Sequence, residues 1–282
     1  MRKYLLYSTL VIFSLITAFI IYLSVFGIKT EKFNDLIKDK VKIIDPKLSI
    51  NINDVFLKLN IKEKSINIDT QNSNLNINKK FINLDKINLN LDIFKFFKKE
   101  NSIKNITITS KKNKIKNLTE FLNSYKFSIP RLIIYNQIED GNIKFTVNIN
   151  PLENNKNNFT YNIKGEISEG RLNIFNNTKI KDIKFDFYFK DKRYDIKKAS
   201  FNYKDVNFYS KEILIKKLNN IYEIQGDLEN KKELIDVNSI SKLFNINLNF
   251  LENKKILAQT YNEFKFKINS KRKLKNVELI SK

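Results

Sequence analysis

The chain contains no cysteine and no histidine, and it has only five glycines and three prolines among its 282 residues. Without cysteine it cannot form disulfides, thiolate nucleophiles or cysteine-ligated metal sites. Without histidine it lacks the commonest general base and the commonest transition-metal ligand. The scarcity of glycine and proline excludes a collagen-like or linker-type chain. Asp and Glu remain, so carboxylate chemistry is not excluded.

Paired acidic residues are the remaining candidates for catalysis or metal binding. Each pair falls at an expected turn or on the polar face of an expected strand, where a structural role is typical. The chain also lacks glycine-rich phosphate loops and a nucleophile-elbow motif. We therefore predict that the protein is not an enzyme and holds no cofactor and no metal. The pairs are Glu139 with Asp140, Asp182 with Asp186, and Asp191 with Asp195.

Positive charge is in large excess, with 52 lysines and arginines against 30 acidic residues and a formal net charge of +22. Such a surface attracts anionic lipid or nucleic acid. The lysines are scattered along the chain, a pattern that is also typical of solvated polar faces. The hydrophobic content of 42% is enough for a packed core.

Residues 4–26 form an uncharged apolar run, YLLYSTLVIFSLITAFIIYLSVF. At about 1.5 Å per residue the run makes roughly 34 Å of helix, enough to cross a hydrocarbon core of about 30 Å. A cleaved signal peptide is the alternative, but the run exceeds the usual length and no small-x-small cleavage site follows it. We predict that residues 1–28 are a cytoplasmic tail and a transmembrane anchor.

The charges beside this run predict its orientation. Arg2 and Lys3 precede it, whereas Lys29 and Lys32 follow it and are partly offset by Glu31. The positive-inside rule then favours a cytoplasmic N-terminus. We predict a single-pass protein of the inner membrane, with its C-terminal region in the periplasm of a Gram-negative bacterium.

Residues 30–42 have apolar side chains at helical spacing, with Thr30 as the predicted N-cap. This short amphipathic helix has two predicted placements. It packs on the first strands, or it lies on the lipid surface. The spaced apolar residues are Phe33, Leu36, Ile37 and Val41.

From Leu48 onward the apolar period changes to two, which indicates strands with one apolar and one polar face. Residues 116–124 and 236–244 are predicted as short helices. Strands are expected to resume at 245–251 and 260–269.

The middle of the chain contains a stronger local signal. Pro130 predicts a break, and residues 131–150 predict a hairpin that turns at Glu139–Asn142 through an Asp-Gly pair. Pro151 and the polar stretch 153–158 predict a loop. The absence of strand–helix alternation predicts a mainly β, antiparallel protein with few short helices. A closed sandwich or barrel and a long curved sheet with an open groove both fit the periodicity.

Aromatic residues share the apolar strand face with aliphatic ones. An ordinary core and a lipid-facing groove are the two main interpretations. A nucleic-acid platform would instead need exposed aromatics beside a basic groove, so we predict no nucleic-acid partner. The residues assigned to this apolar lining are Ile143, Phe145, Val147, Ile163, Ile167, Ile183, Phe185, Phe187, Phe189, Phe201 and Tyr203.

Three passages resemble the AsmA-like superfamily of Gram-negative envelope proteins. The first is GIKTEKFNDLIKDKV leading into LSININDVFLKLNIKEKSINI, directly after the apolar run. The second is FINLDKINLNLDIFKFFKKENSIKNITITS. The third is YNIKGEISEGRLNIFNNTKIKDIKFDFYFK followed by IKKASFNYKDVNFYSKEILIKKLNNIYEIQGDL. The chain is shorter than the better-known members, so it is expected to be a short or truncated one.

The resemblance implies an elongated curved antiparallel sheet whose apolar groove shields acyl chains while phospholipids pass between membranes. It assigns residues 29–125 to an N-terminal helix and β region, and residues 126–282 to the β-groove. Phospholipid, the inner membrane and other envelope proteins would be the partners. The alternative is an envelope assembly scaffold that engages partner proteins through its β-edges, without lipid transport.

Overall fold

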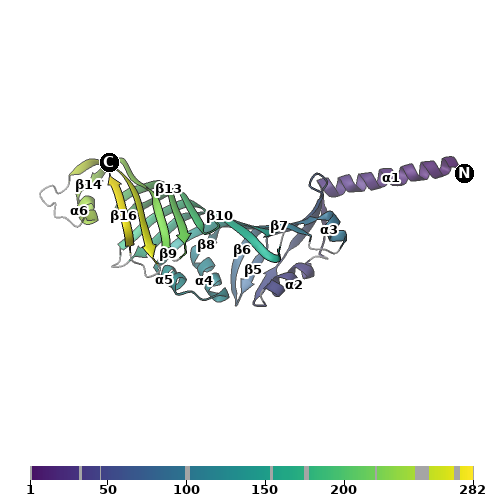
Figure 1. Ribbon diagram of the computed structural model, residues 1–282, viewed down its shortest axis with the longest axis horizontal. Helices are drawn as coiled ribbons and strands as arrows, with labels where there is room; N and C mark the ends of the chain where they lie inside the picture. Colours follow the sequence, from purple (N-terminus) through teal and green to yellow (C-terminus); the bar gives the residue numbers. More distant parts are fainter. Residues whose placement is uncertain are drawn as a thin grey trace. The chain divides into compact units, whose positions relative to one another are not determined.

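The computed structural model describes residues 2–31, 34–44, 46–98, 102–152, 155–174, 178–219, 221–244, 254–269 and 274–281 (Figure 1). The protein is mainly β, with a large curved antiparallel sheet that does not close, an N-terminal apolar helix and few other helices. This confirms the predicted fold class. The chain divides into two compact units. Unit 1 is Met1–Lys111 with Val147–Tyr161, and unit 2 is Lys112–Thr146 with Asn162–Lys282, so the predicted boundary at 125/126 lies inside unit 2.

Unit 1 begins with helix α1 (Arg2–Val25). Its segment Leu6–Val25 is apolar and long enough to cross a membrane, although a signal sequence would have the same character. The helix ends where the Gly27 N–H donates to the Tyr22 carbonyl over 3.3 Å and Gly27 adopts a positive φ of 71°. Strand β1 (Ile28–Lys29) follows at once and pairs with β3 (Asp54–Asn60).

Helix α2 (Asn34–Ile44) begins later than the sequence predicts. The predicted N-cap at Thr30 is wrong, because the Thr30 N–H instead donates to the Val55 carbonyl beside the β1–β3 pair. Phe33 lies outside the described residues. Ile37 packs against the core of unit 1, which confirms the first of the two predicted placements for this helix.

The sheet of unit 1 contains β3, β4 (Ser65–Gln71), β6 (Lys80–Asp92) and β7 (Ile103–Ser110), with β2 (Leu48–Asn51) and β5 (Asn74–Ile77) pairing beside β6. Directly opposite residues on neighbouring strands share a face, so the alternating sequence gathers the apolar side chains under α2. The short helix α3 (Ile93–Phe97) follows β6. One cluster of the buried core of the unit is Val55, Ile66, Ile68 and Leu91.

Unit 2 begins with β8 (Asn113–Lys114), α4 (Ile115–Tyr125) and α5 (Ile129–Gln137). Helix α4 confirms the predicted helix at 116–124. The predicted hairpin across 131–150 is wrong. Pro130 lies in the first turn of α5, because proline is well accommodated there, where its missing N–H is not needed.

Strand β9 (Ile138–Leu152) then runs straight through the Asp-Gly pair. Gly141 has φ 145°, and a Cβ there would lie 2.8 Å from Ile115 Cδ1, so α4 packs on this position. The predicted loop at 151–158 is too long, because β9 reaches Leu152 and β10 (Asn155–Ile174) begins at Asn155.

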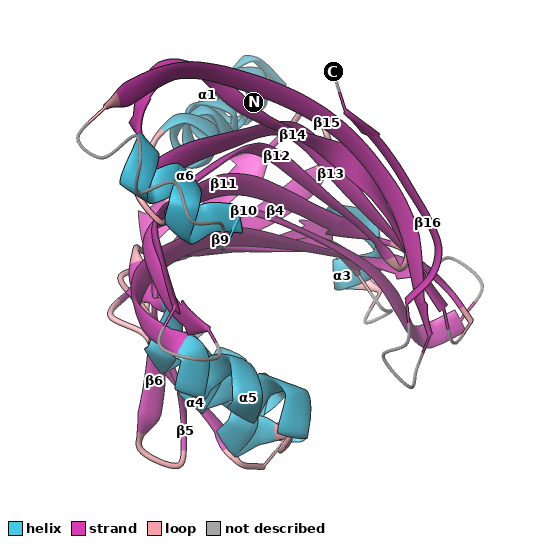
Figure 2. Cartoon of the chain, turned by 90° about the vertical axis from the view of Figure 1, so that its left-hand side faces the viewer, coloured by secondary structure: helices cyan, strands magenta, loops and turns pink. Residues whose placement is uncertain are grey.

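The rest of unit 2 is an antiparallel series of neighbouring strands (Figure 2). They are β11 (Thr178–Lys190), β12 (Arg193–Tyr203), β13 (Val206–Leu218), β14 (Ile221–Asp236), β15 (Lys255–Asn269) and β16 (Leu274–Ser281). Helix α6 (Val237–Phe244) confirms the prediction at 236–244. The strand predicted at 245–251 lies outside the described residues, and β15 confirms the one at 260–269.

Candidate functional site

Two rows of mostly apolar side chains cross the sheet of unit 2. Residues paired across antiparallel strands share a face, so the register identifies each row. The first row is Ile163, Phe189, Tyr194, Ile215, Ile224 and Phe266. The second row is Gly165, Phe187, Ile196, Ile213, Gly226, Phe264 and Leu279. We call the face that carries these rows the apolar face.

Aromatic rings cover the two glycines of the second row. A Cβ on Gly165 would lie 2.7 Å from Phe187 Cζ, and a Cβ on Gly226 would lie 3.0 Å from Phe264 Cζ. Each ring therefore occupies the space that a side chain at the facing glycine would take. In the first row the rings of Phe189 and Tyr194 lie 4.4 Å apart. The rows are consequently a continuous apolar surface without gaps at the glycines.

Bulges interrupt the pairing of β10, β11 and β12 at neighbouring positions. Glu169, Asp182 and Lys198 have φ near +50°, and the register shifts beside each of them. A bulge of this kind bends its strand and increases its twist. Figure 2 shows the strands from β9 to β16 bending in the same direction. Beyond the bulges the apolar face continues, with the rings of Phe201 and Phe208 stacked at 5.4 Å.

Most of the apolar face is only half-buried. Among the predicted lining residues Ile143 alone is buried, at 8% exposure, and the others have intermediate exposure. Within unit 2, α4 meets α5, β8 and the Gly141 position of β9, and α6 meets β14. Ile235 is 6% exposed whereas its neighbour Leu234 is 65% exposed, so α6 packs on the apolar side of β14.

The predicted lining residues largely converge. On β10 and β11, Ile163 pairs with Phe189 and Ile167 pairs with Phe185. Gly165 pairs with Phe187, which lies between these two pairs. Val147 is separate, because it belongs to unit 1. Ile143 and Phe145 lie on β9, and Phe201 and Tyr203 continue the face on β12.

Sequence reasoning missed the half of the apolar face that lies on the later strands. The same period-two signal could have found these residues, because each follows the alternation of its own strand. They are Tyr194, Ile196, Ile213, Ile215, Ile224, Phe264 and Phe266.

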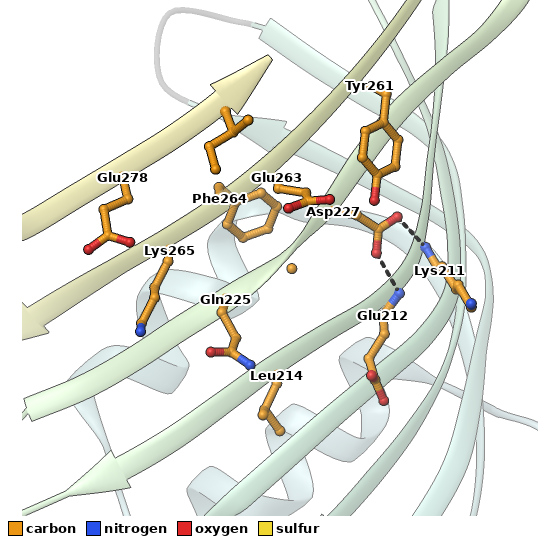
Figure 3. Close-up of a pocket in the computed structure, with 12 residues that line it drawn as sticks. Lys211, Glu212, Leu214, Gln225, Asp227, Tyr261, Glu263, Phe264, Lys265 and Glu278 are labelled. Atoms are coloured by element: carbon orange, nitrogen blue, oxygen red, sulfur yellow. Dashed lines mark hydrogen bonds between the residues drawn. The ribbon is translucent and has the colours of Figure 1, made fainter. Parts of the chain in front are cut away.

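A depression of about 450 Å³ lies on the opposite face of the sheet (Figure 3). The side chains of Leu214 and Gln225, which pair directly, belong to this polar face. Asp227 accepts the backbone N–H groups of Lys211 over 2.8 Å and Glu212 over 3.0 Å, which holds the irregular segment of β13. Other carboxylates line the depression, and the described residues contain no group of three or more metal-ligating side chains.

Tyr261 and Glu263 also line this depression. Burial, followed by hydrogen bonding to Glu263, raises the pKa of the Tyr261 hydroxyl above its ordinary value. The protonated form of this hydroxyl is therefore favoured.

The acidic pairs have structural partners. Asp140 bonds Lys114 over 2.8 Å and Arg171 over 3.1 Å, and its pKa is lowered by Lys114, by the Gly141 N–H and by Arg171. Glu139 pairs with Lys179 over 2.8 Å. In each of the other two pairs, one carboxylate has an ion-pair partner. Asp186 meets Lys198, and Asp195 meets Arg193.

No protein family, curated protein or solved structure matches the chain in the comparisons made. The resemblance to the AsmA-like superfamily therefore stays a prediction. Within the described residues, the main feature of unit 2 is a half-buried apolar sheet face.

Proposed function

We propose that the protein is a membrane-anchored envelope protein whose apolar face binds the acyl chains of phospholipids. In this proposal α1 is a single-pass anchor in the inner membrane and the C-terminal region lies in the periplasm. The apolar face then exchanges phospholipid between membranes, in the way that the AsmA-like resemblance implies. No covalent chemistry is involved.

The observation that carries the proposal is the half-buried state of two continuous apolar rows. From β10 to β15, a row covers about 24 Å at roughly 4.8 Å per strand, a length suited to an extended acyl chain. Soluble proteins seldom leave contiguous apolar surface of this size uncovered without a ligand or a partner. The bend of the strands favours a long, thin ligand over a flat protein partner.

The energetics favour a passive mechanism. Each methylene removed from water contributes about 0.8 kcal/mol, and part of that gain is offset by the ordering of the chain. Binding would thus be favourable but reversible, as exchange requires.

Cations near one end of the strands support contact with anionic headgroups. The register places Lys190 opposite Arg193 and Arg193 opposite Lys216. Directly opposed like charges destabilise a sheet. Asp195 offsets this cost for Arg193, which it meets over 2.7 Å, so an anionic headgroup would serve Lys190 and Lys216.

The scaffold alternative rests on the last described strand. Among the described residues β16 pairs with β15 alone, and Val277, Leu279 and Ile280 on it are 63%, 65% and 55% exposed. An uncovered apolar edge strand can accept a strand from a partner protein.

Two neighbouring positions on β13 provide a matched test. A photo-crosslinking residue replaces either Ile215, on the apolar face, or Leu214, on the polar face, in the full chain expressed in membranes. We expect phospholipid adducts at position 215 and far fewer at position 214, measured by mass spectrometry after irradiation.

Equal adduct yields at the two positions, or none at either, would contradict lipid binding by the apolar face. A third chain with the crosslinker at Val277 separates the alternative. Protein adducts there, without lipid adducts at position 215, would favour the scaffold.

A further inference from the structure

Helix α3 of unit 1 presents three phenylalanines to solvent. Phe94, Phe96 and Phe97 are 62%, 39% and 74% exposed, and Lys95 and Lys98 between and after them are exposed as well. Single exposed apolar residues are common, but adjacent uncovered aromatics mark an interaction surface. This surface belongs to unit 1 and is independent of the apolar face of unit 2.

The exposure follows from an ordered backbone. The Asp92 carboxylate caps α3 by accepting the N–H groups of Phe94 and Lys95, each over 3.0 Å. Ile93 packs against the core of unit 1, and Lys104 lies 3.5 Å from Asp92. Because Ile93 is held inward and the first turn is capped, the following aromatic side chains are directed away from the core.

The turn between β3 and β4 extends the same surface. The Ile93 N–H donates to the Lys64 carbonyl over 3.2 Å, which joins α3 to the turn. Ile61 in that turn is 54% exposed, and Lys62 and Lys64 are exposed. Among the described residues, no acidic side chain forms an ion pair with the lysines of this surface. We call it the α3 patch, and it comprises Ile61, Lys62, Lys64, Phe94, Lys95, Phe96, Phe97 and Lys98.

The α3 patch lies at the end of unit 1 from which α1 leaves. The end of α1 touches β3, since a Cβ on Gly27 would lie 2.8 Å from the Leu57 carbonyl oxygen and 2.6 Å from Lys58 Cγ. Strand β3 ends at Asn60, and the turn of the α3 patch follows directly. Figure 1 shows α3 near the C-terminal end of α1, in the same unit.

We propose that the α3 patch is a second membrane contact of this chain. The inference rests on the proposed anchoring role of α1. The phenylalanines of the α3 patch enter the boundary between acyl chains and headgroups of the bilayer that α1 would cross, and its lysines bind anionic headgroups there. Aromatic residues combined with unpaired lysines are the chemistry of interfacial segments. The α3 patch and α1 lie at the same end of the unit 1 sheet, so the proposed contact is continuous with the anchor.

The absence of cysteine from the chain makes a direct test simple. The full chain carrying Phe97→Cys is labelled with an environment-sensitive dye and reconstituted into vesicles that contain a quencher in the upper acyl chain. One vesicle set is neutral phosphatidylcholine, and the other also contains anionic phosphatidylglycerol. Lys79→Cys is the matched control, because it lies in the turn before β6, about 40 Å along that strand from α3.

We expect the dye at position 97 to be quenched at least about twofold more than the dye at position 79, with a larger difference in anionic vesicles. Adding Lys95→Glu and Lys98→Glu should remove the dependence on anionic lipid. Both labelled chains keep α1. The quencher lies in the upper acyl chain, so insertion of α1 without entry of the α3 patch would leave both positions unquenched. Equal quenching would overturn the proposal, as would a dye at position 97 that is shielded in detergent yet unquenched in vesicles, since that result indicates a protein partner.

Discussion

Replacing Gly165 with alanine tests how closely β9 and β10 approach each other beneath the apolar face. A Cβ at this position would lie 2.3 Å from the Lys144 carbonyl oxygen, 2.7 Å from Phe187 Cζ and 3.0 Å from Phe145 Cα. The phenylalanine ring can rotate away. The Lys144 oxygen cannot do so without moving the backbone of β9, so we expect the main obstacle to be the strand itself.

The expected magnitude follows from two opposing effects. Overpacking a well-packed site costs about 1–3 kcal/mol, and a backbone obstacle falls near the upper end of that range. Alanine regains about 0.5–1 kcal/mol over glycine in a strand, because it loses less conformational entropy on folding. The net loss is therefore about 2 kcal/mol, which should lower the urea midpoint of the full chain in mild detergent, measured by the strand signal in circular dichroism.

Two further variants complete the test. Glu166→Ala changes the next residue, which points to the opposite face and lies across from Asp186, so its removal should change stability by less than about 0.5 kcal/mol. Phe187→Ala, alone and combined with Gly165→Ala, separates the ring from the carbonyl in a double-mutant cycle. The reasoning is refuted if Gly165→Ala is as stable as the wild type, or if its cost disappears when the ring is removed.

Two other predictions concern unit 2 in acid and the core of unit 1. Lys114 and the Gly141 N–H lower the pKa of Asp140, so its stabilisation is present above the ordinary carboxylate pKa of about 4 and is lost as pH falls through the folded pKa. Asp140→Asn should be less stable than wild type at neutral pH, and the two urea midpoints should converge in strong acid; a constant gap would contradict this. Ile68 is 2% exposed in the core, so Ile68→Ala should cost about 2–5 kcal/mol in the same assay. A loss below about 1 kcal/mol would show that the core refills the space.

Local sequence patterns predicted most strands and four of the helices, α1, α2, α4 and α6, because alternation and helical spacing are properties of short segments. They misled at Pro130 and Gly141. Proline is equally suited to breaking a strand and to beginning a helix, and here it lies in the first turn of α5. The Asp-Gly pair lies inside β9 because Ile115 of α4 packs on Gly141, a contact that no local pattern contains.

The sequence predicted which residues of a strand share the apolar face, but it did not predict how those residues align across neighbouring strands. Phe185, Phe187 and Phe189 follow strict alternation, and the structure places all of them opposite residues of β10. The bulges at Asp182 and Lys198 could not be predicted, since a bulge exists only relative to the register of the neighbouring strand. The alignment of apolar residues into rows depends on that register, so it required the structure.

The junction at Gly27 restricts how far unit 1 can move away from α1. A flexible linker would let the unit explore a volume that grows with linker length. Here Gly27 ends α1 and β1 enters the sheet at the next residue, so almost no slack separates the two. With α1 in a bilayer, the α3 patch would be delivered to the lipid surface at a very high effective concentration. Even weak attraction between its side chains and lipid would then be sufficient for the α3 patch to bind the bilayer, because insertion of α1 has already removed the translational cost of reaching the membrane.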